Sequence, residues 1–177
     1  MAALTALARA GVTLVGFVCF VTAAHADNAT LLGVSKNWKA FSNGTGPDKV
    51  CYAITQPVSS QPRKLKREAV GFLINDWPSK GARAQPEIVS GYKYKDNSEV
   101  TVQVGADKFT FYTTNDGGSG SAWMNKVNEE ARVVAAMQRG AQAVVTGISA
   151  HGTMTHDTYS LNGLADVLTK IHTACSM

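Results

Sequence analysis

Residues 143–175 read AVVTGISAHGTMTHDTYSLNGLADVLTKIHTAC, and they carry the clearest secondary-structure pattern of the chain. Segments 143–149 and 153–159 are rich in strand-forming residues and flank the turn His151-Gly152, which predicts two strands joined by that turn. After Ser160 or Asn162 the pattern becomes helical. Apolar residues then recur at the spacing of one helix face: Leu161, Leu164, Leu168 and Ile171. The stretch therefore predicts two strands followed by a C-terminal helix.

Upstream of this stretch, short β-rich segments alternate with turn residues. The predicted strands are residues 38–41, 50–55, 69–77, 87–95, 99–104 and 108–113. Residues 56–67, which hold two prolines, and the Gly/Ser-rich residues 115–121 are predicted to be loops. Many short strands at close spacing favour a β-sandwich or a barrel.

One internal helix follows the strand-rich region. Asn128 is suited to cap its start, and Arg139 and Gly140 suit its last turn and its end. Its apolar face is predicted to consist of Ala131, Val134 and Ala135.

The first 26 residues predict a signal peptide. Arg9 gives a positive start, residues 10–23 are nearly all apolar, and Ala24-His25-Ala26 is a small-residue cleavage pattern. We expect cleavage between Ala26 and Asp27, which leaves residues 27–177 as a single domain in the periplasm, at the cell surface or secreted. The alternative is a membrane anchor, but the uncharged run 10–26 is at the short limit for a bilayer span. We expect no membrane-spanning segment in the mature form.

The cysteines give a second constraint. Of the three cysteines, Cys19 lies in the predicted leader, so only Cys51 and Cys175 remain after cleavage. Two cysteines in an exported chain have one possible intramolecular pairing, and export places them in an oxidising compartment. Cys175 also continues the apolar stripe of the C-terminal helix, facing a core that a strand bearing Cys51 can reach. We therefore predict a Cys51–Cys175 disulfide; the alternative is two buried free thiols.

The composition limits the class of partner. The chain has 177 residues, of which 45% are hydrophobic and 17% charged, which excludes a disordered chain. Loss of Arg9 leaves 16 basic against 13 acidic residues, a mild net charge of +3 with histidine neutral. No basic stretch is interleaved with aromatic residues, so we expect no nucleic-acid partner.

A set of residues and short motifs spread over most of the mature chain is typical of a known protein family. These are Trp38, Cys51, Met137-Gln138-Arg139-Gly140, Gly147-Ile148-Ser149, Gly152, the run from Asp157 to Gly163, and Cys175. On these residues the chain resembles the invasion-associated locus B family of exported bacterial proteins. The resemblance implies a mainly β fold, an Ig-like β-sandwich with one short internal helix and a C-terminal helix. It also implies a small periplasmic or surface protein with no family catalytic residues, and the founding role of the family is host-cell invasion by pathogens.

The basic run Arg63-Lys64-Leu65-Lys66-Arg67 is the strongest candidate for a binding site. Four positive charges on a loop after Pro62 concentrate positive potential, which would attract an anionic envelope component or an acidic protein. The alternative is a solvated loop without a partner. We therefore predict anionic contacts at Arg63, Lys64, Lys66 and Arg67.

Catalytic and metal sites have weaker support. His151, His156 and His172 lack the acidic cluster that would complete a metal site, so we expect no metal and no cofactor. Ser149, His156 and Asp157 supply the residue types of a hydrolase triad, but adjacent strand residues point to opposite faces. We expect a non-enzymatic protein that binds a partner; the alternative is a small periplasmic hydrolase.

Overall fold

The computed structural model describes residues 29–116, 118–124 and 126–177. The predicted leader and its cleavage site at Ala26–Asp27 lie outside these residues. Within them the chain forms eleven strands: β1 (Thr30–Ser35), β2 (Trp38–Asn43), β3 (Val50–Thr55), β4 (Ser59–Gln61), β5 (Gly71–Trp77), β6 (Ala82–Val89), β7 (Glu99–Val104), β8 (Asp107–Thr114), β9 (Ser121–Trp123), β10 (Gln142–Ile148) and β11 (Met154–Ser160). The two helices are α1 (Val127–Arg139) and α2 (Leu164–Cys175).

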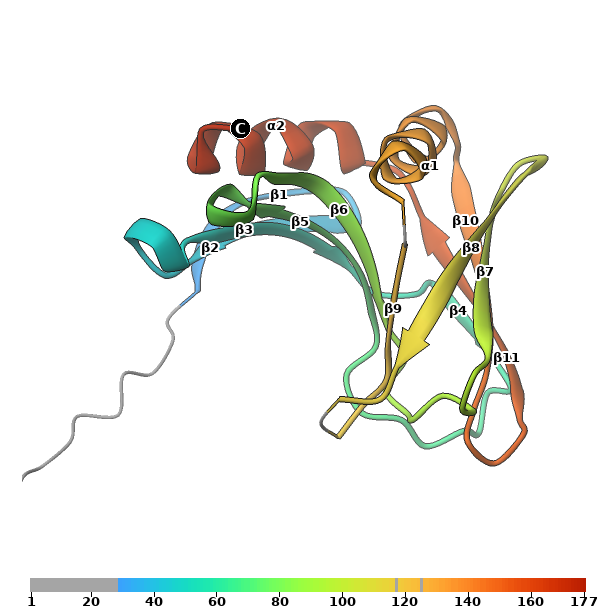
Figure 1. Ribbon diagram of the computed structural model, residues 1–177. Coiled ribbons are helices and arrows are strands. Elements are labelled where there is room, and N and C mark those ends of the chain that lie inside the picture. The colour runs from blue at the N-terminus through green and yellow to red at the C-terminus, as the bar shows by residue number, and fades with distance from the viewer. Residues whose placement is uncertain (1–28, 117, 125) are drawn as a thin grey trace, which may run out of the picture.

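All the strands belong to one antiparallel sheet in the order β1-β2-β3-β5-β6-β9-β8-β7-β10-β11-β4. Strands β1, β2, β3, β5 and β6 arch beneath α2, while β7, β8, β10 and β11 stand on the other side of the molecule (Figure 1). Because β2 and β5 touch β11, far along this order, the sheet folds over on itself. The predicted mainly β, sandwich-like fold with an internal and a C-terminal helix is confirmed.

Three aromatic side chains join the two halves of the sheet. Trp38 and Tyr159 are fully buried, and the Trp38 indole Nε1 donates a hydrogen bond to the Ser160 carbonyl over 3.0 Å. Phe72 lies between them, with its ring centroid 5.6 Å from that of Tyr159 in an edge-to-face arrangement. Large aromatic rings bury much apolar area, so this cluster contributes strongly to closing the fold.

The C-terminal helix follows the predicted pattern closely. Leu164, Leu168 and Ile171 are buried on one face of α2, and Cys175 ends the same stripe with 4% of its surface exposed. Cys175 is joined to Cys51 of β3 by a disulfide whose Cα atoms lie 6.0 Å apart. The bond therefore attaches α2 to the sheet that it covers.

Several local predictions were wrong. The strand predicted at 87–95 ends at Val89, because Ser90 and Gly91 turn the chain and Gly91 adopts a positive φ of 71°. The predicted loop 56–67 contains the short strand β4. The buried face of α1 includes Val133 and Met137, whereas the predicted Ala131 is exposed.

Candidate functional site

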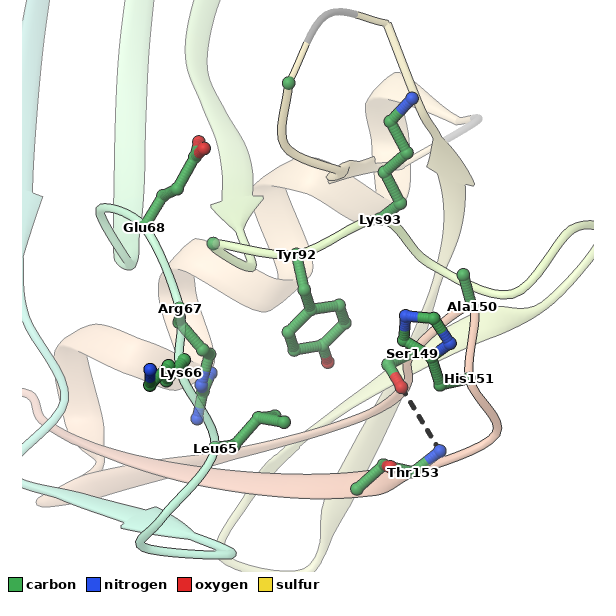
Figure 2. Close-up of a pocket in the computed structure, with 12 residues that line it drawn as sticks. Leu65, Lys66, Arg67, Glu68, Tyr92, Lys93, Ser149, Ala150, His151 and Thr153 are labelled. Carbon is green, nitrogen blue, oxygen red and sulfur yellow. Dashed lines mark hydrogen bonds between the residues drawn. The ribbon is translucent and has the colours of Figure 1, made fainter.

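A surface pocket of about 680 Å³ lies beside the predicted basic run (Figure 2). Four segments far apart in the sequence line it: residues 65–68 between β4 and β5, residues 91–93 after β6, Gly118 between β8 and β9, and the turn around His151 between β10 and β11. Tyr92 packs against the core and Ser149 is buried, so two of the segments that line the pocket are held by the folded domain. We refer to this feature as the basic-loop pocket.

Arg67, at the end of the basic run, is held in a buried ion pair. Its Nη1 and Nη2 atoms donate to the two carboxylate oxygens of Asp157, over 2.7 and 2.5 Å. The side chains are only 6% and 5% exposed. The expectation that Arg67 offers its charge to an outside partner is therefore wrong, because its guanidinium group is occupied by a carboxylate of β11.

Further contacts fix the position of Arg67. Its Nη1 also lies 3.4 Å from the Ser90 carbonyl, and its guanidinium carbon lies 5.6 Å from the centre of the Tyr92 ring. The hydrogen bond to Asp157 raises the pKa of Arg67, although burial opposes this shift. A fork of two parallel hydrogen bonds to a carboxylate restricts the guanidinium in both distance and plane. Arg67 thereby anchors the loop that carries the rest of the basic run.

Tyrosines extend this polar network beneath the pocket. The Tyr92 hydroxyl lies 2.6 Å from the Thr155 hydroxyl, and the Tyr92 and Tyr94 rings meet edge to face. Burial raises the pKa values of Tyr92, Tyr94 and Tyr159 above their ordinary value of 10. All three hydroxyls therefore keep their protons at neutral pH, and none supplies a nucleophile or a general base there.

The remaining charges of the basic run are exposed to solvent. Arg63, Lys64 and Lys66 all have exposed side chains, in agreement with the predicted loop. Lys66 lines the basic-loop pocket, as does Lys93, whose side chain is also exposed. Lys93 was not predicted as part of the site, because residues 87–95 were predicted to form a strand. The acidic side chain that lines the pocket is Glu68.

The residues considered for a hydrolase are engaged elsewhere. The Ser149 hydroxyl accepts a hydrogen bond from the Thr153 amide, the bond drawn in Figure 2. The His156 Nδ1 atom lies 3.0 Å from the Thr146 hydroxyl, and Asp157 is paired with Arg67. His156 is exposed while Asp157 is buried, as expected for neighbours on one strand. The structure does not bring the three together as a triad.

The third histidine has an acidic partner that the sequence did not reveal. His172 of α2 places its Nδ1 atom 2.7 Å from Oδ2 of Asp76, which is fully buried in β5. The other Asp76 oxygen accepts a hydrogen bond from the Ala84 amide. This pair lies beside the disulfide, since Asp76 is the cross-strand partner of Cys51. It supports the docking of α2.

Two features are absent from the described part of the chain. Residues 29–116, 118–124 and 126–177 contain no group of three or more His, Cys, Asp or Glu side chains placed to hold a metal ion. Neither α1 nor α2 is long and apolar enough to cross a membrane.

Comparison with known proteins decides the family. The family model described as "Invasion associated locus B (IalB) protein" matches residues 38–172, well over half of the chain. The chain belongs to the IalB family. The resemblance predicted from the sequence is thus confirmed. IalB is not a known enzyme family.

A solved structure supports the fold of this IalB protein. The crystal structure of invasion associated protein b from Bartonella henselae is similar with a TM-score of 0.55 at 17% sequence identity. The similarity covers 82% of this chain and 98% of that chain. At this identity the likeness concerns the fold alone. No curated protein matches the chain.

Proposed function

We propose that this IalB protein is exported and acts without catalysis, by binding a negatively charged partner at the exposed side chains of the basic run and at the adjoining basic-loop pocket. The partner is an anionic envelope component or an acidic protein surface. In a pathogen, the same binding would serve host-cell invasion, as the family name indicates. The proposed location is the periplasm or the cell surface, after removal of the leader.

One observation carries this proposal: Arg67 is buried while its basic neighbours are exposed. The Arg67–Asp157 ion pair fixes the end of the loop to β11 and leaves Arg63, Lys64 and Lys66 in solvent. A loop held on a rigid scaffold can present side chains to a partner at little cost in ordering the backbone. Lys93 adds a second exposed positive charge to the lining of the pocket.

The proposed attraction is cooperative and sensitive to salt. A single exposed ion pair contributes only about 0.2–1 kcal/mol, so binding requires several of these side chains to act together. Exposed charges are screened beyond about 8 Å at physiological ionic strength. Binding should therefore weaken steadily as salt is added.

The test is co-sedimentation with phospholipid vesicles, comparing vesicles that contain phosphatidylglycerol with neutral phosphatidylcholine vesicles. The wild-type protein should sediment with the anionic vesicles at low salt and be released at high salt. The variant Arg63→Ser/Lys64→Ser/Lys66→Ser should lose most of this binding, because it removes the exposed charges and keeps Arg67.

The matched control is Arg83→Ser/Lys108→Ser/Arg132→Ser, which removes three exposed basic side chains from β6, β8 and α1. It lowers the net charge by as much as the basic-run variant does. If binding depends on where the charges lie, the control variant should still bind the anionic vesicles. Equal binding by both triple variants would contradict the proposal. Crosslinking in the intact cell envelope would then identify which anionic component the wild-type protein contacts.

A further inference from the structure

The two ends of the sheet are built differently. At one end β4 is only three residues long, Ser59–Gln61, and is followed directly by Pro62 and the charged Arg63. Short strands, prolines and charges are the features by which proteins protect a sheet edge from pairing with another chain. At the other end β1 is six residues long and reads TLLGVS, with neither a charge nor a proline.

The β1 edge also exposes apolar side chains. Leu31 and Val34 are 53% and 54% exposed, among the most exposed large apolar side chains of the described chain. A bulge between Leu31 and Gly33 shifts the register, so both side chains lie on the outer face although they are three residues apart. Leu32 instead packs against the core. The bulge thus places the two exposed apolar side chains on the same face of the edge.

These two side chains continue an apolar surface on the neighbouring strands. Directly paired residues of antiparallel strands share a face, and Leu31 pairs with Phe41, which pairs with Tyr52. The Phe41 and Tyr52 rings stack with centroids 5.4 Å apart. They line a pocket of about 550 Å³ on this face.

The inner face of β1 is fixed by α2. The Ser35 hydroxyl donates a hydrogen bond to the Asp166 carboxylate of α2 over 2.6 Å. The strand is therefore held in place, while the sheet order places no further strand beside it within the described residues. A pre-ordered edge strand of this kind is ready to accept another strand without folding first.

We propose that β1 pairs in antiparallel fashion with β1 of a second copy of this chain, forming a two-fold symmetric dimer. In the register that fits best, Leu31 lies opposite Val34 of the partner subunit. Both side chains are then on the outer face, where each covers part of the other. The two apolar surfaces join into one that crosses the dimer axis.

The sequence of β1 is what favours a second copy over an unrelated strand. A two-fold axis requires a segment to be complementary to itself, and the uncharged TLLGVS meets no like charge in this register. Lys36, the first charge after β1, lies opposite Ala29 of the partner subunit, so the two Lys36 side chains do not face each other. The pairing therefore brings no like charges of the two β1 strands face to face.

The first test is the oligomeric state of the protein purified after expression of the full chain, measured by light scattering and sedimentation. The wild type should be a dimer. Leu31→Lys/Val34→Lys should be a monomer at the same concentration, with a dissociation constant raised at least tenfold, because four lysines would meet at the axis. Met154→Lys is the matched control, since Met154 is 55% exposed on β11, and it should stay dimeric.

The second test fixes the register and does not depend on the lysine variant. Leu31→Cys and Val34→Cys proteins are each oxidised alone and as a mixture. The mixture should form far more disulfide-linked dimer than either protein alone, because position 31 faces position 34 across the axis. A monomeric wild type would overturn the proposal, as would a dimer that survives the double lysine substitution or gives no excess of mixed crosslink.

Discussion

The two ends of the basic run have opposite environments although their sequence looks uniform. Arg63, Lys64 and Lys66 stand in solvent, whereas Arg67 is only 6% exposed in its side chain and is bound by Asp157. All four carry the same charge and lie within five residues of one another. The difference arises from a carboxylate ninety positions along the chain.

This difference separates a structural charge from charges that are free to bind. A buried cation without a partner costs several kcal/mol, so burial of Arg67 depends on Asp157. The exposed cations keep their hydration and contribute little to folding. A count of charges in a loop therefore does not measure how many of them a partner can reach.

The largest effect is expected for the disulfide, which, like the Arg67–Asp157 ion pair, joins residues far apart in the sequence. Its contribution to stability can therefore be compared with that of the ion pair. Cys51 and Cys175 are separated by 124 positions, and a loop of that size is worth about 5 kcal/mol in the chain-entropy model. Cys175→Ser should lower the free energy of unfolding by that order and sharply reduce the folding yield. Chemical denaturation measures it.

Two controls accompany the cysteine variant. The wild-type protein under reducing conditions should lose similar stability, and Ser176→Ala, a change at the neighbouring exposed residue, should lose little. A Cys175→Ser protein as stable as the wild type would show that α2 docks without the bond. The ion pair would then be the stronger of the two long-range links.

A smaller effect is expected at Glu87, a mostly buried carboxylate with neutral partners. Ser121 and Asn75 donate hydrogen bonds to it, yet burial raises the pKa of Glu87 above its ordinary value of 4.5. As the pH rises above 4.5, Glu87 therefore loses its proton in the unfolded chain before it does so in the folded protein. The folded state loses stability relative to the unfolded chain until the pH passes the raised pKa. Glu87→Gln should remove this decline.

The measurement for Glu87 is the melting temperature from mildly acidic to neutral pH. The difference between the variant and the wild type should grow in favour of the variant as the pH rises. The acceptor lost in glutamine shifts the whole curve by a constant, so the shape of the difference carries the result. A difference that stays constant with pH would contradict the raised pKa.

The parts of the fold that were predictable have strong local patterns. The stripe from Leu161 to Ile171 gave α2, and the strands 50–55 and 99–104 agree with β3 and β7 residue for residue. The disulfide followed from a count of cysteines and from the position of Cys175 on that stripe. In each case residues close in sequence, or a single possible pairing, held the information.

Some of the parts that were missed depend on distant contacts, whereas β1, which was also not predicted, pairs with its sequence neighbour β2. Strands β4 and β9 have three residues each, too few for an alternating pattern, and they exist because β11 and β6 offer them an edge. The burial of Arg67 depends on Asp157, and no residue near Arg67 in the sequence signals it. The place of Lys93 follows instead from the turn at Ser90 and Gly91, which ends the strand predicted at 87–95.

The most direct test of the division within the basic run compares two variants by chemical denaturation. Arg67→Met leaves the Asp157 carboxylate buried and unpaired, so it should lower the free energy of unfolding by about 3–5 kcal/mol. The double variant Arg67→Met/Asp157→Leu should recover most of the lost stability, because it leaves no unpaired buried charge at this position. Arg63→Ser/Lys64→Ser/Lys66→Ser should change the free energy of unfolding by less than about 1 kcal/mol. A triple variant that loses as much stability as Arg67→Met would contradict the division, since it would place all four charges in the structure of the fold.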